Sequence, residues 1–168
     1  MTNEMRGNPR AATKSDTETA AKRILAIDYG RKRIGLALSD ELGLTAQPLL
    51  TLNRADRRND MRRLREICAR HGVTRIVVGH PLHITGEAGE MADEAERFAA
   101  RISKELGIAT ELLDERLTSW EAKQTMAETK SRSRRKGETT DAIAAAVLLR
   151  DYLESQSNET SRKPLEKP

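Results

Sequence analysis

The hydrophobic residues of this 168-residue chain form two closely spaced runs early in the sequence. The first run is residues 24–27 and ends on Asp28, and the second is residues 34–38 and ends on Ser39. A short polar stretch that contains Gly30 separates them. Two such runs joined by a short glycine-containing turn predict a β-hairpin. Because the apolar residues are consecutive, we expect both strands to be buried on both faces, as in the centre of an α/β sheet.

Further predicted elements follow, with strands and helices in alternation. Residues 45–52 predict a third strand, and Pro48 places it at a sheet edge because proline cannot donate to the ladder. Apolar positions at helical spacing predict helices over residues 56–70 and from about 90 to 106. The other predicted elements are strands at 75–79 and 109–113, a helix that starts at Thr118, and a last helix from Thr139 or Thr140 to about Leu153. This order predicts a mixed α/β sheet with helices on its faces.

Both ends of the chain lack apolar periodicity. Residues 1–21 and 155–168 are polar and charged, and we expect disordered tails because such segments bury too little apolar surface to offset their ordering entropy. The stretch 22–154 is then one domain of ordinary size, with enough residues to bury a core. The single Cys68 excludes an internal disulfide and a cysteine-based zinc site, and we expect it to be a buried, inert thiol.

Charge and composition narrow the class of partner. The formal net charge is +4 and the pI about 9.4, and the basic residues are clustered, which favours nucleic acid. Aromatic residues make up only 2%, which argues against base stacking as the main mode of binding. No apolar run approaches the ~20 residues of a membrane span, and the N-terminus has no signal-peptide core. We therefore expect a cytoplasmic protein that does not contact a membrane.

Three acidic residues stand at the ends of predicted elements. Asp28 follows the first strand, Glu115 follows the last strand, and Asp141 lies in the first turn of the last helix. Parallel strands bring their carboxyl ends to one edge of a sheet, where α/β proteins bind ligands. Converging carboxylates suit hard cations such as Mg²⁺ or Mn²⁺, and two such ions support phosphodiester hydrolysis. The structural alternatives are a turn residue at Asp28, a surface ion pair at Glu115 and a favourable helix N-terminal charge at Asp141.

Basic residues and histidines supply further candidates. One basic cluster lies on the helix at 56–70 and also fits a solvated helix face, whereas another is a Ser-rich loop at 130–137, directly before Asp141. Such cations would hold phosphates. The predicted nucleic-acid-binding residues are Arg31, Lys32, Lys130, Arg132, Arg134, Arg135 and Lys136. The spacing of His80 and His83 allows metal ligation or proton transfer, and loop histidines with structural hydrogen bonds are the alternative.

Four ordered blocks of sequence carry a family resemblance. They are Ile27-Asp28-Tyr29-Gly30 with Arg33-Ile34-Gly35-Leu36-Ala37, then Val77-Val78-Gly79-His80-Pro81-Leu82, then Asp114-Glu115-Arg116-Leu117-Thr118, and last Arg134-Arg135-Lys136 with Asp141-Ala142-Ile143-Ala144-Ala145. Together, over about residues 23–153, they resemble the YqgF family of bacterial proteins, which are described as pre-16S rRNA nucleases and as Holliday junction resolvases. The chain departs from the family pattern in the loop 85–89 and at His80, where an apolar residue is commoner.

The resemblance implies a ribonuclease-H-like fold, a five-stranded mixed sheet whose first three strands are antiparallel, with helices on both faces. It implies that Asp28, Glu115 and Asp141 are catalytic and bind a divalent metal. The implied activity is metal-dependent phosphodiester hydrolysis in 5′-end processing of pre-16S rRNA, and we expect a monomer or a weak homodimer.

Other functions stay open at this point. One alternative is a Holliday junction resolvase acting on branched DNA, and another is a non-catalytic RNA-binding protein on the same fold. Asp28 and Gly30 also resemble the phosphate loop of actin-like and sugar kinases, but those enzymes need a second domain to close over the nucleotide.

Overall fold

Five strands form one mixed sheet in the computed structural model, which describes residues 23–83, 89–117 and 139–162. The spatial order is β3-β2-β1-β4-β5, with β1, β2 and β3 antiparallel and with β4 and β5 parallel to β1. The strands are β1 (Arg23–Tyr29), β2 (Arg33–Ser39), β3 (Ala46–Asn53), β4 (Val73–His80) and β5 (Ala109–Asp114). The sheet therefore has the predicted number of strands and the predicted antiparallel start.

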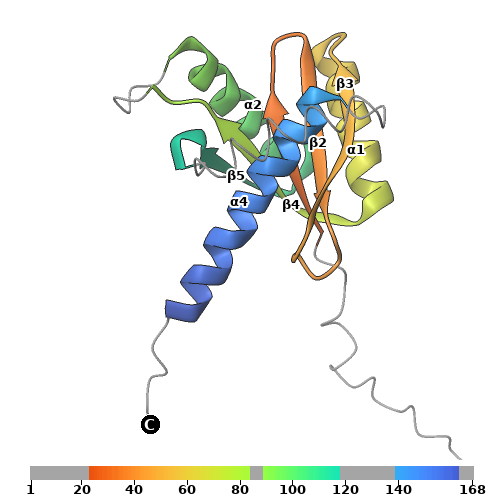
Figure 1. Ribbon diagram of the computed structural model, residues 1–168. Coiled ribbons are helices and arrows are strands. Elements are labelled where there is room, and N and C mark those ends of the chain that lie inside the picture. The colour runs from red at the N-terminus through yellow and green to blue at the C-terminus, as the bar shows by residue number, and fades with distance from the viewer. Residues whose placement is uncertain (1–22, 84–88, 118–138, 163–168) are drawn as a thin grey trace, which may run out of the picture.

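Helices cover both faces of this sheet, as predicted. In Figure 1, α4 crosses the front of the sheet while α1 and α2 lie behind it. The helices are α1 (Arg57–His71), α2 (Glu90–Leu106) and α4 (Thr140–Arg162), and a short 3₁₀ helix, η1 (Glu115–Leu117), follows β5. The helix predicted to start at Thr118, the basic loop at 130–137 and most of the atypical loop at 85–89 lie outside the described residues.

Local signals in the sequence set the ends of α1. The Asp56 side chain accepts a hydrogen bond from the backbone N–H of Asn59 at 2.9 Å, which satisfies one of the free donors of the first turn. At the other end Gly72 adopts a left-handed conformation with φ of 64°, and its N–H donates to the carbonyl of Cys68. Cys68 itself is buried, and burial raises the pKa of its thiol to about 11.

The two faces of the sheet bury different kinds of side chain. Beneath α1 and α2 the core is made of large residues, among them Leu25, Ile27, Leu64, Ile76, Phe98 and Ile102. Beneath α4 the sheet contributes small residues, including Ala26 and Ala37, which pack against Ala145 of the helix. At Gly35 the approach is closest, because a Cβ there would overlap the backbone carbonyl of Asp141. The N-terminal turn of α4 therefore rests directly on β2.

Proline and the absence of helix breakers explain two details of the elements. The strand β3 lies at the edge of the sheet, as predicted. Near Pro48 its register with β2 shifts by one residue, because Leu36 pairs with Leu50 whereas the next residue, Ala37, pairs with Pro48. The predicted end of the last helix near Leu153 is wrong, because α4 continues to Arg162 with no glycine or proline to stop it. Residues 155–162, predicted as tail, are therefore helical, and the rest of both tails lies outside the described residues.

Within the described residues, no helix combines the length and the apolar character that crossing a bilayer requires.

Candidate active site

Asp28 lies near the end of β1 between two glycines on the neighbouring strands. It pairs with Gly35 of β2, and on the other side Gly79 follows Val78, the partner of Ile27 on β4. Because side chains alternate along a strand, Asp28 shares the α4 face with Ala26. The missing side chains let other parts of the chain come close to the strands on both sides of this carboxylate.

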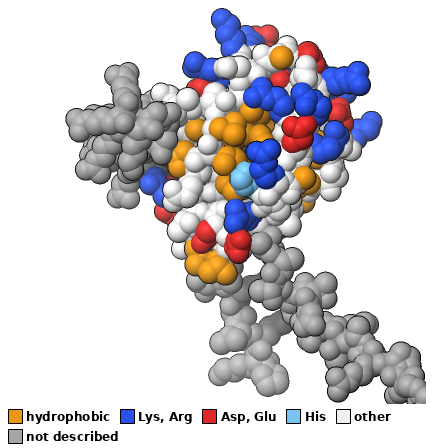
Figure 2. Space-filling view, turned by 90° about the vertical axis from the view of Figure 1, so that its right-hand side faces the viewer, with side chains coloured by type: hydrophobic (Ala, Val, Ile, Leu, Met, Phe, Trp, Pro, Cys, Tyr) orange, Lys and Arg blue, Asp and Glu red, His pale blue; other side chains and the backbone are white. Residues whose placement is uncertain are grey.

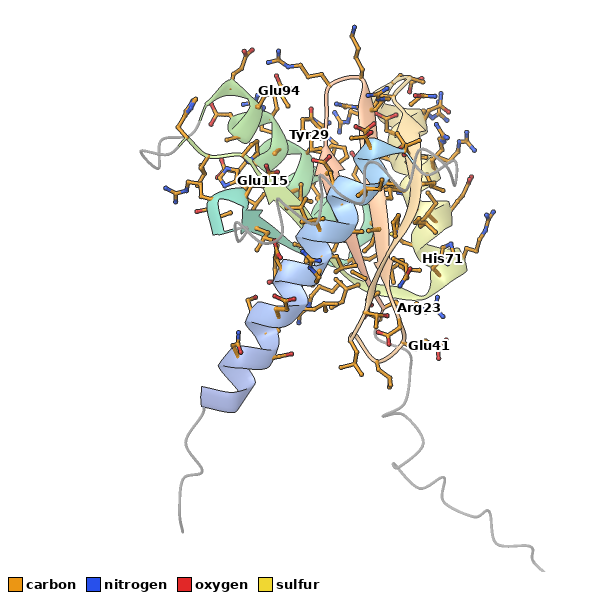
Figure 3. All side chains as sticks on the ribbon, in the orientation of Figure 1. Arg23, Tyr29, Glu41, His71, Glu94 and Glu115 are labelled. Atoms are coloured by element: carbon orange, nitrogen blue, oxygen red, sulfur yellow. The ribbon has the colours of Figure 1, made fainter. Side chains whose placement is uncertain are left out.

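The other two predicted acidic residues approach these glycines, Asp141 with its backbone and Glu115 with its side chain. The backbone of Asp141 occupies the place that a Cβ on Gly35 would take, and Oε1 of Glu115 occupies the corresponding place at Gly79. Figure 3 shows Glu115 at the same end of the sheet as Tyr29, the residue after Asp28, and far from Arg23 and Glu41. One strand end, one 3₁₀ turn and one helix start thus converge at this end of the sheet.

The other two carboxylates act electrostatically on Asp28. Burial, followed by the negative charges of Glu115 and Asp141, raises the pKa of Asp28 to about 7. Burial and the charge of Asp114 also raise the pKa of Glu115. A site of this kind costs free energy when its acids are ionised, and a cation that neutralises them would recover it.

The acids are not gathered into a finished metal-ligand cluster. In the parts of the chain that the structure describes, no three His, Cys, Asp or Glu side chains form a group that could hold a metal ion. The carboxylate of Asp141 instead forms an ion pair with Arg33, whose Nε lies 2.8 Å from its Oδ2. The donor chemistry, three carboxylates with oxygen ligands only, nevertheless fits a hard divalent cation.

A second network holds the turn that follows Asp28. Arg31 lies 2.8 Å from Glu94 and 2.9 Å from Glu90 of α2, so this predicted nucleic-acid ligand is engaged within the protein. Tyr29 donates from its hydroxyl to Glu94 at 3.3 Å and packs against Phe98 in a tilted arrangement, with ring centroids 4.9 Å apart. Figure 3 shows Tyr29 and Glu94 close together above the sheet.

A buried ion pair completes this network, and no clear signal in the sequence predicts it. Asp60 of α1 is 3% exposed and accepts a bond from Nε of Arg54 at 3.0 Å. Arg54 also donates to the Tyr29 hydroxyl at 2.9 Å and to the Gly30 carbonyl at 3.2 Å. The guanidinium lies over the Tyr29 ring, 5.0 Å from its centroid. The pair therefore fixes the β1–β2 turn against α1 and thereby supports Asp28.

The two histidines do not join the carboxylates in a metal-ligand group among the described residues. His80 ends β4 opposite Asp114 of β5, and its Nε2 is buried without a hydrogen-bond partner in that part of the chain. His83 contacts Gly89. Asp114 is occupied by Arg116, whose Nη2 lies 2.6 Å from its carboxylate, and this contact lowers the pKa of Asp114.

Basic side chains gather on the side of the molecule that carries β3 and α1, as Figure 2 shows. Arg57, Arg58, Arg62 and Arg65 line a shallow groove there together with Glu105. Part of this charge is compensated, because Arg57 pairs with Glu105 and Arg62 with Glu66, each at 2.9 Å. Of the predicted nucleic-acid-binding set only Arg31 and Lys32 fall within the described residues.

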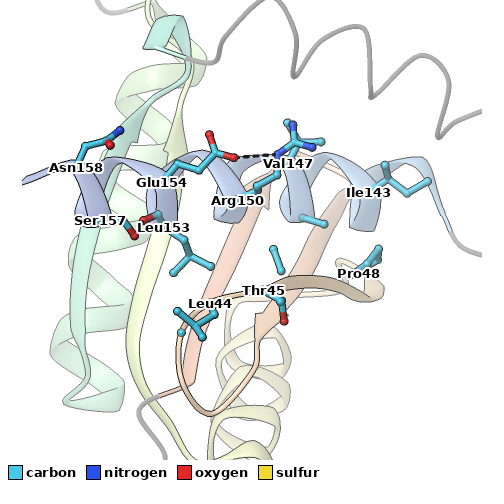
Figure 4. Close-up of a pocket in the computed structure, with 13 residues that line it drawn as sticks. Leu44, Thr45, Pro48, Ile143, Val147, Arg150, Leu153, Glu154, Ser157 and Asn158 are labelled. Carbon is cyan, nitrogen blue, oxygen red and sulfur yellow. Dashed lines mark hydrogen bonds and ion pairs between the residues drawn. The ribbon is translucent and has the colours of Figure 1, made fainter. Parts of the chain in front are cut away.

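A larger open groove lies elsewhere along α4. Its volume is about 630 Å³, and it lies between the β2–β3 loop and one side of the helix (Figure 4). Leu44, Pro48, Val147 and Leu153 give it an apolar lining, which includes none of the three carboxylates. The candidate active site is therefore the strand-end cluster around Asp28, and this groove is a separate feature.

The fold is that of the RuvC-like branch of ribonuclease-H-like nucleases. A Thermus thermophilus RuvC structure in complex with a Holliday junction substrate superposes with a TM-score of 0.54 and covers 80% of this chain and 96% of that one. The two sequences are 14% identical, so the likeness establishes the fold alone. The predicted ribonuclease-H-like fold is confirmed.

Sequence comparison then identifies the family. A profile of the RuvX family, described as "Holliday junction resolvase", matches residues 22–155. Proteins named "Putative pre-16S rRNA nuclease" match this chain. The protein of Opitutus terrae is 45% identical, and the match covers 80% of this chain and 92% of that protein. The protein of Koribacter versatilis is 41% identical, and the match covers 79% of this chain and 86% of that protein. The chain belongs to the RuvX family, also called YqgF, and the predicted family is confirmed.

Proposed function

We propose that this protein is a divalent-metal-dependent nuclease that hydrolyses phosphodiester bonds of pre-16S rRNA in the cytoplasm. The observation that supports the proposal is that the Asp141 backbone and the Glu115 side chain approach the two glycines beside Asp28, and that the charges of Glu115 and Asp141 help to raise its pKa. Relatives named as pre-16S rRNA nucleases, at 41% and 45% identity, support the choice of substrate.

The three carboxylates would hold Mg²⁺ or Mn²⁺, and a metal bound there activates water and stabilises the leaving oxygen. Asp28 occupies the centre of the site, and its pKa of about 7 means that without a cation it carries a proton for much of the time at neutral pH. Glycines at positions 35 and 79 allow the Asp141 backbone and the Glu115 side chain to approach the strands on either side of it. Asp141 joins the ligand set once it leaves Arg33.

Nucleic acid would be held by cations of the segment that precedes Asp141 in the sequence. Lys130, Arg132, Arg134, Arg135 and Lys136 precede Asp141 in sequence, and we assign them the role of neutralising backbone phosphates. Replacing the four of them from Arg132 to Lys136 with alanine should weaken RNA binding. The salt dependence of binding should flatten by about one unit of slope for each phosphate that these side chains no longer neutralise.

Cleavage of branched DNA is the second candidate function. The family description and the RuvC-like fold favour it, although fold alone does not fix the substrate. A third candidate, RNA binding without catalysis, would require that the three carboxylates serve only the fold.

The decisive experiment compares the wild type with Asp28→Asn on end-labelled pre-16S rRNA and on a four-way DNA junction, in Mg²⁺, Mn²⁺ or chelator. We expect metal-dependent RNA cleavage by the wild type and none by the variant, because an amide lacks the charge that a hard cation requires. Asp40→Asn is the matched control, since Asp40 follows β2 at the opposite end of the sheet. Normal cleavage by Asp28→Asn would refute the site, and binding without cleavage by the wild type would favour the non-catalytic alternative.

A further inference from the structure

We propose that Arg33 and the divalent metal compete for Asp141, and that metal binding transfers the Arg33 guanidinium from this carboxylate to a phosphate of the nucleic acid. The inference rests on the proposed function, because it concerns the same carboxylates. It adds a role for a residue that lies outside the predicted site.

The geometry places Arg33 at the rim of the site. It is the first residue of β2, two positions before Gly35, so both residues face α4. Its Nε lies 2.8 Å from Oδ2 of Asp141, and its side chain is 61% exposed while that of Asp141 is 25% exposed. The guanidinium therefore reaches the carboxylate from the solvent side and can leave it without disturbing the core.

The ion pair and a metal ion exclude one another for two reasons. Oδ2 of Asp141 is a weaker ligand while the Arg33 guanidinium lies 2.8 Å from it, because part of its negative charge is already neutralised, and a guanidinium in that position repels a dication. In the metal-free protein the Arg33 guanidinium neutralises the Asp141 carboxylate. If a metal took over this neutralisation, Arg33 would be left as a free cation at the rim of the site.

The released side chain is suited to phosphate. A guanidinium presents a planar fork of donors that matches two phosphate oxygens, and its charge does not depend on pH in the physiological range. The exchange is also energetically accessible, because exposed ion pairs contribute little stability. One residue would thus couple occupation of the metal site to capture of the substrate.

Arg31 provides a matched control in the same turn. It carries the same charge two residues earlier but pairs with Glu94 and Glu90 of α2. Neutralising Arg31 changes the net charge as much as neutralising Arg33 does, yet leaves the contact with Asp141 in place.

The first test measures Mn²⁺ binding by calorimetry at low salt and without nucleic acid. We expect Arg33→Gln to bind Mn²⁺ about two- to five-fold more tightly than the wild type, the factor set by removal of an exposed ion pair, and Arg31→Gln to be nearly unchanged. In an Asp141→Asn background the Arg33 substitution should have no further effect.

If the wild type binds Mn²⁺ and Arg33→Gln binds it no more tightly, this inference fails alone. If the wild type binds no Mn²⁺, the proposed metal-dependent function fails as well.

The second test measures RNA affinity by fluorescence anisotropy, in chelator and in Ca²⁺. We expect Arg33→Gln to match the wild type in chelator, where Asp141 holds the guanidinium, and to bind several-fold more weakly with Ca²⁺. Equal weakening in both conditions would show a permanent phosphate contact, and unchanged affinity with Ca²⁺ would show no phosphate contact. Either result overturns the exchange.

Discussion

The two faces of the sheet solve opposite problems with the same strands. In β1, Leu25 and Ile27 face α1 and α2, whereas Ala26 and Asp28 face α4. The first face buries large aliphatic side chains, which supply most of the stabilisation that burial provides. The second face uses small residues, so that a helix approaches closely and carboxylates fit between helix and sheet.

This contrast shows how a continuous apolar run can serve both stability and function. A core of large residues on the α4 face would exclude both the carboxylates and a cation. Glycines and alanines on the α4 face bury less apolar surface but leave space for the helix and the acidic residues. The large residues on the α1 and α2 face supply the burial that the α4 face lacks. Substitutions on the two faces should therefore have different effects on folding and on cleavage.

Gly35→Ala should produce the largest effect. The new methyl group would overlap the Asp141 carbonyl, which is backbone and cannot rotate away, so the start of α4 must shift. We expect the unfolding free energy to fall by more than about 3 kcal/mol and cleavage to be abolished. Gly79→Ala is the comparison, because the atoms it meets are side-chain ends of Glu115 and Leu148. Equal urea midpoints for the two variants would contradict this account.

Leu64→Ala should lower stability by about 2–5 kcal/mol and leave cleavage per folded molecule unchanged. Leu64 belongs to α1 and is fully buried against the sheet, on the face away from the carboxylates. Urea unfolding and initial rates measured well below the melting temperature separate the two quantities. Leu42→Ala is the control. Leu42 is 78% exposed, so its substitution should change neither the stability nor the cleavage rate. A lower cleavage rate in the folded Leu64 variant would show that the two faces are not independent.

Asp28→Asn should stabilise the metal-free protein above pH 7. The pKa of Asp28 rises from 3.8 to about 7 on folding, so the wild type loses stability as the pH rises through that window. The variant has no carboxylate to lose this stability, so its free energy of unfolding at pH 8 should exceed that of the wild type by about 2 kcal/mol. This is less than the full pKa shift would give, because the carboxylate is only partly buried. Denaturant unfolding at pH 4 and pH 8 measures the difference.

An Asp→Asn substitution should have the opposite effect on stability at Asp40, because the N–H groups of Thr45 and Leu44 lower the pKa of this residue. Asp40→Asn should therefore lose stability at neutral pH. Equal pH profiles for the wild type and Asp28→Asn would show that Asp28 is not strained by burial and like charge.

Tyr152→Phe should have the smallest effect, about 1 kcal/mol. The Tyr152 hydroxyl accepts from Arg75 at 2.9 Å and donates to Glu111 at 3.1 Å, which ties α4 to β4 and β5. Thermal unfolding should show the decrease while cleavage remains normal. A large drop in cleavage would mean that this contact helps to position the N-terminal end of α4.

The sequence is sufficient to predict elements whose signals are local. The hairpin, the edge position of β3 and the stop at Gly72 follow from apolar runs, Pro48 and glycine. The positions of Asp28, Glu115 and Asp141 at element ends also predict which end of the sheet their elements reach, because strand direction determines it. Their convergence into a metal-ligand group stays a prediction, since the described residues contain no such group.

The remaining features depend on how helices sit on the sheet. The Arg33–Asp141 and Arg54–Asp60 pairs join residues whose proximity no periodicity reveals. The extension of α4 to Arg162 is not predicted, because polar residues after Leu153 suggest a tail although none of them breaks a helix.

The buried thiol of Cys68 makes this protein well suited to site-specific labelling. With a pKa of about 11 and 4% exposure, it forms little thiolate and offers reagents little access. It is also the only cysteine in the chain. A cysteine introduced on the exposed surface of α4 would therefore be the one reactive thiol in an otherwise native sequence, and a spin label attached there would report how the helix moves when metal and RNA bind.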